Sequence, residues 1–169
     1  MQIYWSLLVF FAFVFLAAMS GGIFRPGEWY RGLAKPSWNP PDWAFPVAWT
    51  ALYGTMAVAA WLVYEAAGFT LAGMVAIGFW FIQLVLNALW SALFFGAKRM
   101  DYALWDAAGM WLAIVGTIIA FAPINTISAL LMVPYLLWVS FAIFLNWTLI
   151  KMNPDNDGTQ LAAPGGSGG

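Results

Sequence analysis

The chain has 169 residues, of which 64% are apolar and only 8% are charged, and its mean hydropathy is +0.82. Soluble domains carry about 25% charged residues, so this composition excludes an ordinary water-soluble protein. The net charge of -1 offers no basic footprint for nucleic acid. Cysteine and histidine are both absent, which excludes disulfides, thiol and imidazole metal sites and the commonest general base. We therefore expect an integral membrane protein that requires no metal or cofactor.

Five stretches are long and apolar enough to cross a bilayer as helices, which takes about 20 residues each. The charge-free run that follows Asp106 is too long for one crossing, and Pro123 marks the break because proline cannot donate the amide that a helix interior needs. The predicted helices span residues 3–24, 43–64, 69–95, 102–122 and 127–151. The sequence thus predicts an all-α bundle over residues 1–151, followed by a disordered tail over 152–169.

The six basic residues all fall in connections or helix ends on one side of this bundle. They are Arg25, Arg31, Lys35, Lys98, Arg99 and Lys151. The two opposite turns carry no basic residue. The positive-inside rule therefore predicts a multi-pass protein with its N-terminus on the outer side of the membrane and its C-terminus in the cytoplasm.

The first connection, residues 25–42, is long for a helical bundle, a property typical of functional loops. Its segment PGEWYRGLA favours a short interfacial helix with proline in the first turn. The following segment KPSWNPPD cannot be helical, because Pro36, Pro40 and Pro41 restrict their own backbone and that of the preceding residues. Two interpretations stay open: a membrane-surface connector with aromatic anchors, and a semi-rigid lid over a cavity.

Tryptophan occurs twelve times, and those near helix ends fit an aromatic belt at the membrane surface. Three others lie deeper on helical stripes, two of which also carry amides. The stripes are Phe45, Trp49, Tyr53 and Met56; Gln83, Asn87, Trp90, Ser91 and Phe94; and Trp138, Ala142 and Asn146. Amides are costly in hydrocarbon, so these faces should turn inward. The amides then serve either as hydrogen-bond glue between helices or as polar groups of a pocket for a flat ligand.

Three segments together resemble the signature regions of the tryptophan-rich sensory protein family, whose eukaryotic members are called translocator protein or peripheral benzodiazepine receptor. The segments are WNPPDWAFPVAWTALYG, NALWSALFFGAKR and PYLLWVSFAIFLN. The resemblance implies a five-helix bundle, often a homodimer, that binds porphyrins, related tetrapyrroles and other planar hydrophobic molecules in a cavity under the first loop. The family's ligand-binding positions fall on Trp38, Pro40, Trp49, Tyr53, Asn87, Trp90, Trp138 and Ala142.

Three classes of function are compatible with the sequence. We favour a membrane receptor or sensor for porphyrins, because aromatic walls with a few amides suit a planar ligand. The alternatives are light-dependent degradation of a bound porphyrin, with Trp49 or Trp138 as redox partner, and transport of tetrapyrrole or lipid. The chain offers no nucleophile and base pair for conventional catalysis, so we expect no catalytic residues. The family's sterol motif is incomplete, since Trp147 stands where tyrosine is required, and sterol binding is weakly supported.

Overall fold

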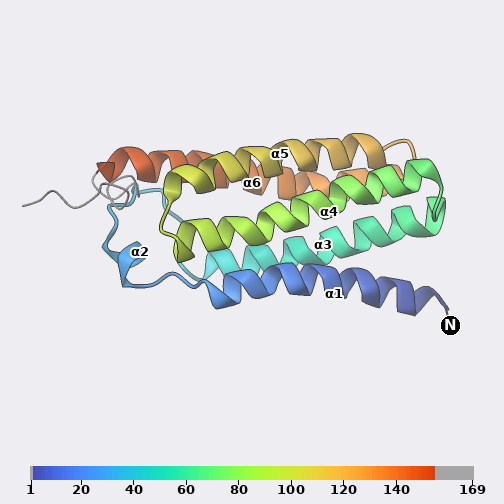
Figure 1. The fold of residues 1–169 in the computed structure, drawn as a ribbon, viewed down its shortest axis with the longest axis horizontal. Helices are drawn as coiled ribbons and strands as arrows, with labels where there is room; N and C mark the ends of the chain where they lie inside the picture. The colour runs from blue at the N-terminus through green and yellow to red at the C-terminus, as the bar shows by residue number, and fades with distance from the viewer. Residues whose placement is uncertain (1, 155–169) are drawn as a thin grey trace, which may run out of the picture.

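The computed structural model describes residues 2–154, with side chains from residue 5 onward. Five long helices run side by side along the bundle (Figure 1). They are α1 (Gln2–Ile23), α3 (Ala44–Ala67), α4 (Leu71–Ser91), α5 (Met100–Phe121) and α6 (Thr126–Met152). Within the described range there is no strand, and five helices are long and apolar enough to cross a membrane. The prediction of an all-α bundle with five membrane-spanning helices is confirmed. The predicted tail, 152–169, lies outside the described residues from residue 155 onward.

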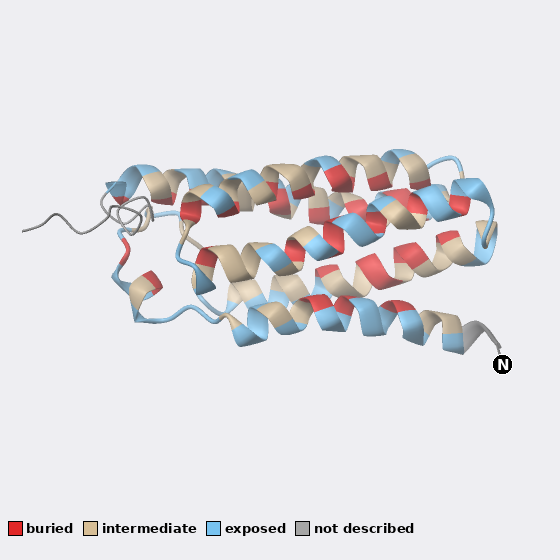
Figure 2. Cartoon of the chain, in the orientation of Figure 1, coloured by how far each residue is buried: buried red, intermediate tan, exposed pale blue. Residues whose placement is uncertain are grey.

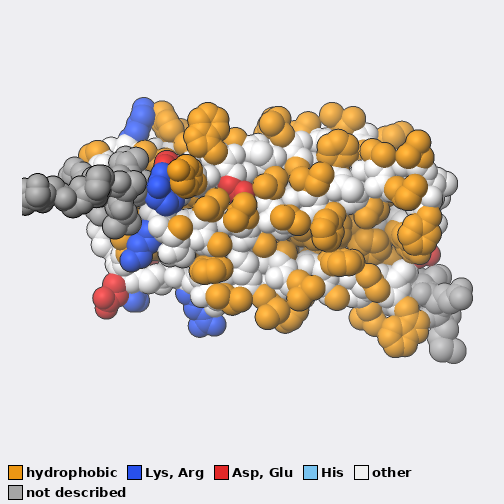
Figure 3. Space-filling model, viewed as in Figure 1, with side chains coloured by type: hydrophobic (Ala, Val, Ile, Leu, Met, Phe, Trp, Pro, Cys, Tyr) orange, Lys and Arg blue, Asp and Glu red, His pale blue; other side chains and the backbone are white. Residues whose placement is uncertain are grey.

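Two short elements lie at one end of the bundle. The helix α2 (Glu28–Gly32) occupies the first connection, and a π-helical turn, η1 (Ala92–Gly96), extends α4. Figure 3 shows that the lysine and arginine side chains visible on this face gather at the end that carries α2. The side of the membrane that this end faces stays a prediction.

The long helices form a closed ring in the order α1, α3, α6, α5, α4, and α3 also touches α4 across the interior. Buried positions face inward along the helices, whereas the outer faces are exposed (Figure 2). Those outer faces are rich in large apolar side chains such as Phe15, Leu112 and Leu137. An apolar exterior of this kind suits contact with lipid rather than water.

The helix boundaries follow from local signals in the sequence. Gly68 ends α3 with a positive φ of 53°, a conformation that glycine adopts without steric cost. Thr70 then caps α4, because its side-chain oxygen accepts a hydrogen bond from the Gly73 amide at 3.2 Å. Asn125 caps α6 in the same way by accepting from the Ser128 amide at 3.1 Å. Pro123 lies in the turn between α5 and α6, where a break was predicted.

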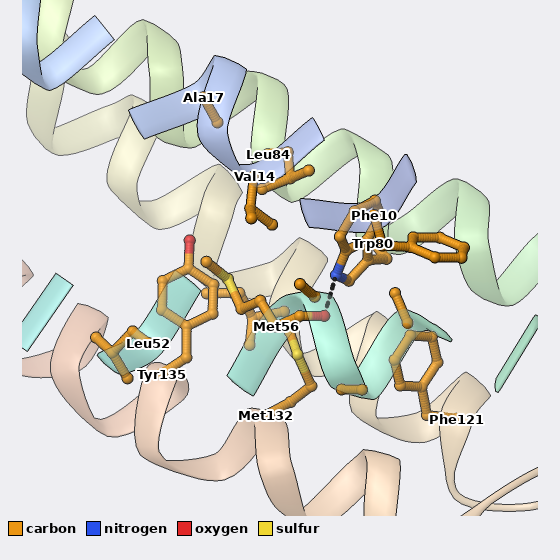
Figure 4. Close-up of a cluster of buried hydrophobic side chains, with 14 of the residues drawn as sticks. Phe10, Val14, Ala17, Leu52, Met56, Trp80, Leu84, Phe121, Met132 and Tyr135 are labelled. Atoms are coloured by element: carbon orange, nitrogen blue, oxygen red, sulfur yellow. Dashed lines mark hydrogen bonds between the residues drawn. The ribbon is translucent and has the colours of Figure 1, made fainter. Parts of the chain in front are cut away.

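The main core occupies the half of the bundle remote from α2. Trp80 of α4 is fully buried there, and its indole nitrogen donates to the Met56 carbonyl at 3.1 Å (Figure 4). On α3 the neighbouring positions Ala57, Ala59 and Ala60 are completely buried. Small residues let membrane helices approach closely, so this half of the bundle is solidly packed.

A polar side chain at the end of the last helix binds the loop that contains α2. Asn153, at the end of α6, accepts from the Ala34 amide at 2.8 Å and donates to the Ala34 carbonyl at 2.9 Å. Its nitrogen also donates to the Leu149 carbonyl. Beside this contact, the buried Leu33 packs in a second apolar cluster that includes Leu149. The loop is therefore held against α6 by both polar and apolar contacts.

Replacing Asn153 by alanine should free the loop locally without unfolding the bundle, because it removes both bonds to the Ala34 backbone. We expect faster hydrogen–deuterium exchange of peptides that cover residues 30–38 and a stability loss of about 1 kcal/mol. Thr148→Ala is the matched control, since among the described residues the Thr148 hydroxyl bonds only to the Phe144 carbonyl of its own helix. Unchanged exchange in Asn153→Ala would show that the loop is held by other contacts.

The start of α4 leaves no room for a side chain at Gly73, where an added Cβ would overlap the Gly68 carbonyl oxygen. Gly73→Ala should therefore destabilise the protein by about 1–3 kcal/mol, read as a lower Tm in detergent. Gly78→Ala, in the same helix, should be neutral because an added Cβ there meets nothing within 4 Å. Equal melting temperatures for the two variants would contradict this account.

Candidate ligand-binding cavity

A cavity of about 560 Å³ opens inside the bundle between the main core and the α2 end. All five long helices contribute to its lining, as do the first loop and the π-helical turn. The lining is mostly apolar and aromatic, with a few polar groups. Ligand sites in proteins commonly have this size and composition.

Six of the eight residues predicted to bind ligand lie together in this lining. They are Trp49, Tyr53, Asn87, Trp90, Trp138 and Ala142. Trp49 is the central contact, because its ring stacks on Tyr53 at 5.4 Å and meets Trp138 nearly at right angles at 6.4 Å. The three predicted stripes therefore converge on one space, although their fully buried members Met56 and Gln83 do not line it.

The other two predicted residues, Trp38 and Pro40, are not part of the lining. Trp38 lies against α6 instead, where its ring stacks on Phe144 with centroids 5.2 Å apart and meets the edge of Phe141. It is 42% exposed, and Phe144 is also exposed. In this structure Trp38 thus anchors the loop on the outside of the bundle, and a contact of Trp38 or Pro40 with ligand stays a prediction.

A chain of hydrogen bonds forms the polar part of the cavity floor. The Tyr53 hydroxyl donates to Asn87 Oδ1 at 2.6 Å, and Asn87 Nδ2 donates to the Tyr135 hydroxyl at 3.1 Å. Tyr135 is fully buried, and its hydroxyl reaches the Met110 sulfur at 3.2 Å. These four residues come from α3, α4, α6 and α5. Asn87 therefore acts as glue between helices while it also borders the cavity.

The side-chain amide of Asn146 forms hydrogen bonds with the backbone of α5. In the orientation that satisfies both of its ends, the nitrogen donates to the Met100 carbonyl and the oxygen accepts from the Leu104 amide, each at 3.2 Å. Asn146 borders the cavity but is only 1% exposed. Its amide thus serves chiefly to hold the first turn of α5 against α6, which favours the structural interpretation of this residue.

The π-helical turn brings two successive phenylalanines to the same space. Its wider turn is closed by a bond from the Ala97 amide to the Ala92 carbonyl at 2.8 Å. Phe94 and Phe95 both line the cavity, and Trp90 stacks on Phe94 with centroids 4.9 Å apart. Single π turns inside helices occur frequently at functional sites. The sequence pattern predicted a continuous helix here and did not reveal this turn.

Several lining residues were not among the predicted ligand-binding residues. Ala18 and Gly21 of α1 lie at the cavity, where their small side chains leave space. Tyr30 of α2 and Asp42, just before α3, lie at the loop side of the cavity. Burial raises the pKa of Tyr30, and the negative charge of Asp42 raises this pKa further. A hydrogen bond with Asn39 lowers the pKa by a smaller amount. Tyr30 and Asp42 therefore share one electrostatic environment at the rim.

Among the described lining residues of the cavity there is one carboxylate, that of Asp42. Over the part of the chain described here, no group of three carboxylate, thiol or imidazole side chains is placed to hold a metal ion. The intramembrane acid Asp106 does not line the cavity, and both of its oxygens are buried without a hydrogen-bond partner among the described residues. The mostly apolar lining of the cavity suits an apolar ligand.

Comparison with known proteins identifies the family. The sequence profile of the TspO/MBR family matches residues 7–152. The chain is 42% identical to the tryptophan-rich sensory protein of Cereibacter sphaeroides over 90% of this chain and 95% of that relative. It is 38% identical to the translocator protein of Homo sapiens over 82% and 84% of the two chains. Protein CrtK of Rhodobacter capsulatus is 38% identical over 86% and 91%. As the signature segments indicated, the chain belongs to the TspO/MBR family.

Proposed function

We propose that this chain is a membrane receptor or sensor that binds porphyrins and similar planar hydrophobic ligands in the cavity under its first loop. The observation that carries the proposal is the convergence of Trp49, Trp90 and Trp138, from three separate helices, on one apolar space of about 560 Å³. The names of two relatives, a tryptophan-rich sensory protein and a translocator protein, support a membrane sensor or receptor.

The geometry of the rings suits a flat guest. Trp49 and Trp138 are inclined by 84°, so a planar ligand that stacks on one indole meets the edge of the other. Both arrangements are favourable for aromatic rings. The Tyr53 and Asn87 groups at the floor retain capacity for a further hydrogen bond, and they would orient the polar part of a ring system that reaches them.

The direct test is a titration of the purified protein in detergent with protoporphyrin, followed by quenching of tryptophan fluorescence. Replacing Trp49 and Trp138 together by phenylalanine should weaken binding about fivefold or more, because each replacement removes stacking area worth roughly 0.5–1.5 kcal/mol. Since the variant also loses two fluorophores, binding is measured in parallel by the porphyrin absorbance.

Trp43→Phe is the matched control, because Trp43 is 69% exposed and does not line the cavity. It should bind protoporphyrin like the unmodified chain. Equal affinity of the double variant and the control would remove the cavity from the function.

A second candidate function is light-dependent degradation of the bound porphyrin. It is favoured by the contact of Trp49 with both Trp138 and Tyr135, whose centroids lie 6.4 and 6.1 Å from it. In that step the light-excited porphyrin would accept one electron from Trp49, and a neighbouring ring, Trp138 or Tyr135, would return an electron to Trp49. Dissolved dioxygen would be the oxidant that opens the porphyrin ring. Under this hypothesis, porphyrin absorbance declines in light but not in darkness, and Trp49→Phe slows the decline more than it weakens binding. Loss at the same rate without protein would reject this candidate.

A further inference from the structure

The lining of the cavity reaches the molecular surface on one side of the bundle. Among the described residues, the lining members on α4, η1, α5 and α6 are buried or half-buried. The exposed lining members belong to α1, the first loop and α3, and they are Gly21, Pro26, Asp42, Pro46 and Thr50. We call these five residues the mouth of the cavity.

The mouth extends from the loop into the membrane-spanning part of the bundle. Thr50 lies in the second turn of α3, roughly 9 Å along the helix axis from its start. The Thr50 hydroxyl donates to the Pro46 carbonyl of the same helix at 2.8 Å, so it tolerates apolar surroundings. Because α1 and α3 are neighbours (Figure 1), the mouth opens between two helices toward lipid.

Side-chain size along α1 decides where the seam between α1 and α3 is open. In the remote half, Phe10 and Val14 of α1 are buried in the main core (Figure 4), and the Phe10 ring lies 5.8 Å from that of Tyr64 on α3. Near the loop, α1 offers only the small Ala18 and Gly21 to the cavity. The seam is therefore closed by large side chains in one half and left open in the other.

The seam on the other side of α3, toward α6, is closed by an aromatic side chain. A groove of about 440 Å³ lies on the outside of this seam, and Ala51 of α3 is among its lining residues. Trp138 lines both this groove and the cavity. Its ring contacts Phe45 and Phe141 at 5.9 and 5.7 Å. Passage here would require the Trp138 ring to move.

Two further routes are closed by polar contacts. Between α1 and α4, the Ser20 hydroxyl donates to the Ala88 carbonyl at 2.5 Å. Above the cavity, the two hydrogen bonds from Asn153 to the Ala34 backbone hold the middle of the loop against α6. A ligand that used either route would have to break these contacts, whereas the mouth is open in the structure as it stands.

The physical state of the ligand also favours a route from lipid. A planar hydrophobic molecule concentrates in the bilayer, and its transfer to water costs about 25 cal/mol for each Å² of apolar surface exposed. Entry between α1 and α3 leads from lipid directly to the rings of Trp49 and Tyr53, which lie beside Thr50 on α3 and line the cavity. This route keeps the apolar surface of the ligand out of water throughout.

We propose that planar hydrophobic ligands enter and leave the cavity sideways from the lipid, through the mouth between α1 and α3. The inference rests on the proposed function, because it assigns a route to the same cavity. Thr50 marks the membrane-embedded end of this route, and Asp42 lies at its loop end.

The test obstructs the mouth after the protein has folded. Because the chain has no cysteine, Thr50→Cys and Ala51→Cys each provide a single site for a maleimide. The variants are placed in lipid nanodiscs and labelled either with a bulky aryl maleimide or with the small N-ethylmaleimide. Association and release of protoporphyrin are followed by quenching of tryptophan fluorescence, and Kd is measured at equilibrium.

The bulky label on Thr50→Cys should slow both association and release about tenfold and change Kd less than about twofold, because an obstruction on the route affects both rates alike. N-ethylmaleimide should have a smaller effect. Ala51→Cys is the matched control, since Ala51 is the exposed neighbour of Thr50 but lines the outer groove instead of the cavity. Its labelled forms should keep both rates.

Three results would overturn the inference. The first is unchanged rates with the bulky label on Thr50→Cys. The second is equal slowing with the label on Ala51→Cys, or stronger slowing with the same label on Asp42→Cys, which would indicate another seam or entry from water. The third is a large change of Kd through faster release alone, which would place Thr50 in the ligand contact and not on the route. Failure of the unlabelled chain to bind protoporphyrin would instead refute the proposed function.

Discussion

The structure depends on the hydrogen-bond chain from Tyr53 through Asn87 to Tyr135. Polar groups inside a membrane must find partners within the protein, and these three satisfy one another across α3, α4 and α6. The contact from Tyr135 to Met110 brings in α5. These hydrogen bonds connect four helices at one depth of the bundle and mark the boundary between the packed core and the cavity.

On either side of this boundary, side-chain size along α3 decides how closely its neighbours approach. Toward the far end, Ala57, Ala59 and Ala60 are completely buried and allow close packing. Toward the loop, Phe45 and Trp49 are large and rigid, and their rings line the cavity instead of filling it. The packed half of the bundle fixes the distance between the helices. Toward the loop, the large aromatic side chains do not fill the space between the helices at that distance, and a cavity remains.

The first loop completes the site from outside. Asn153 and Trp38 fasten it to α6, one by bonds to the Ala34 backbone and the other by stacking on Phe144. Tyr30 meanwhile packs against Phe94 and borders the cavity. The loop is therefore held mainly by contacts outside the cavity, which leaves its inner rim available to a ligand. That the loop acts as a lid stays a prediction.

The sequence by itself determined the five membrane crossings and the inward faces, because helical periodicity fixes both the depth and the direction of residues such as Trp49, Asn87 and Trp138. The sequence also sufficed to identify the family, because three separate segments resemble its signature regions. The tertiary structure decided which polar group each amide meets, as Asn146 shows, and that Trp38 turns outward while Tyr30 and Asp42 face the cavity. The physical reason is that the path of a loop and the partners of a side chain depend on packing between segments far apart in the sequence. Helical periodicity carries no information about such long-range contacts.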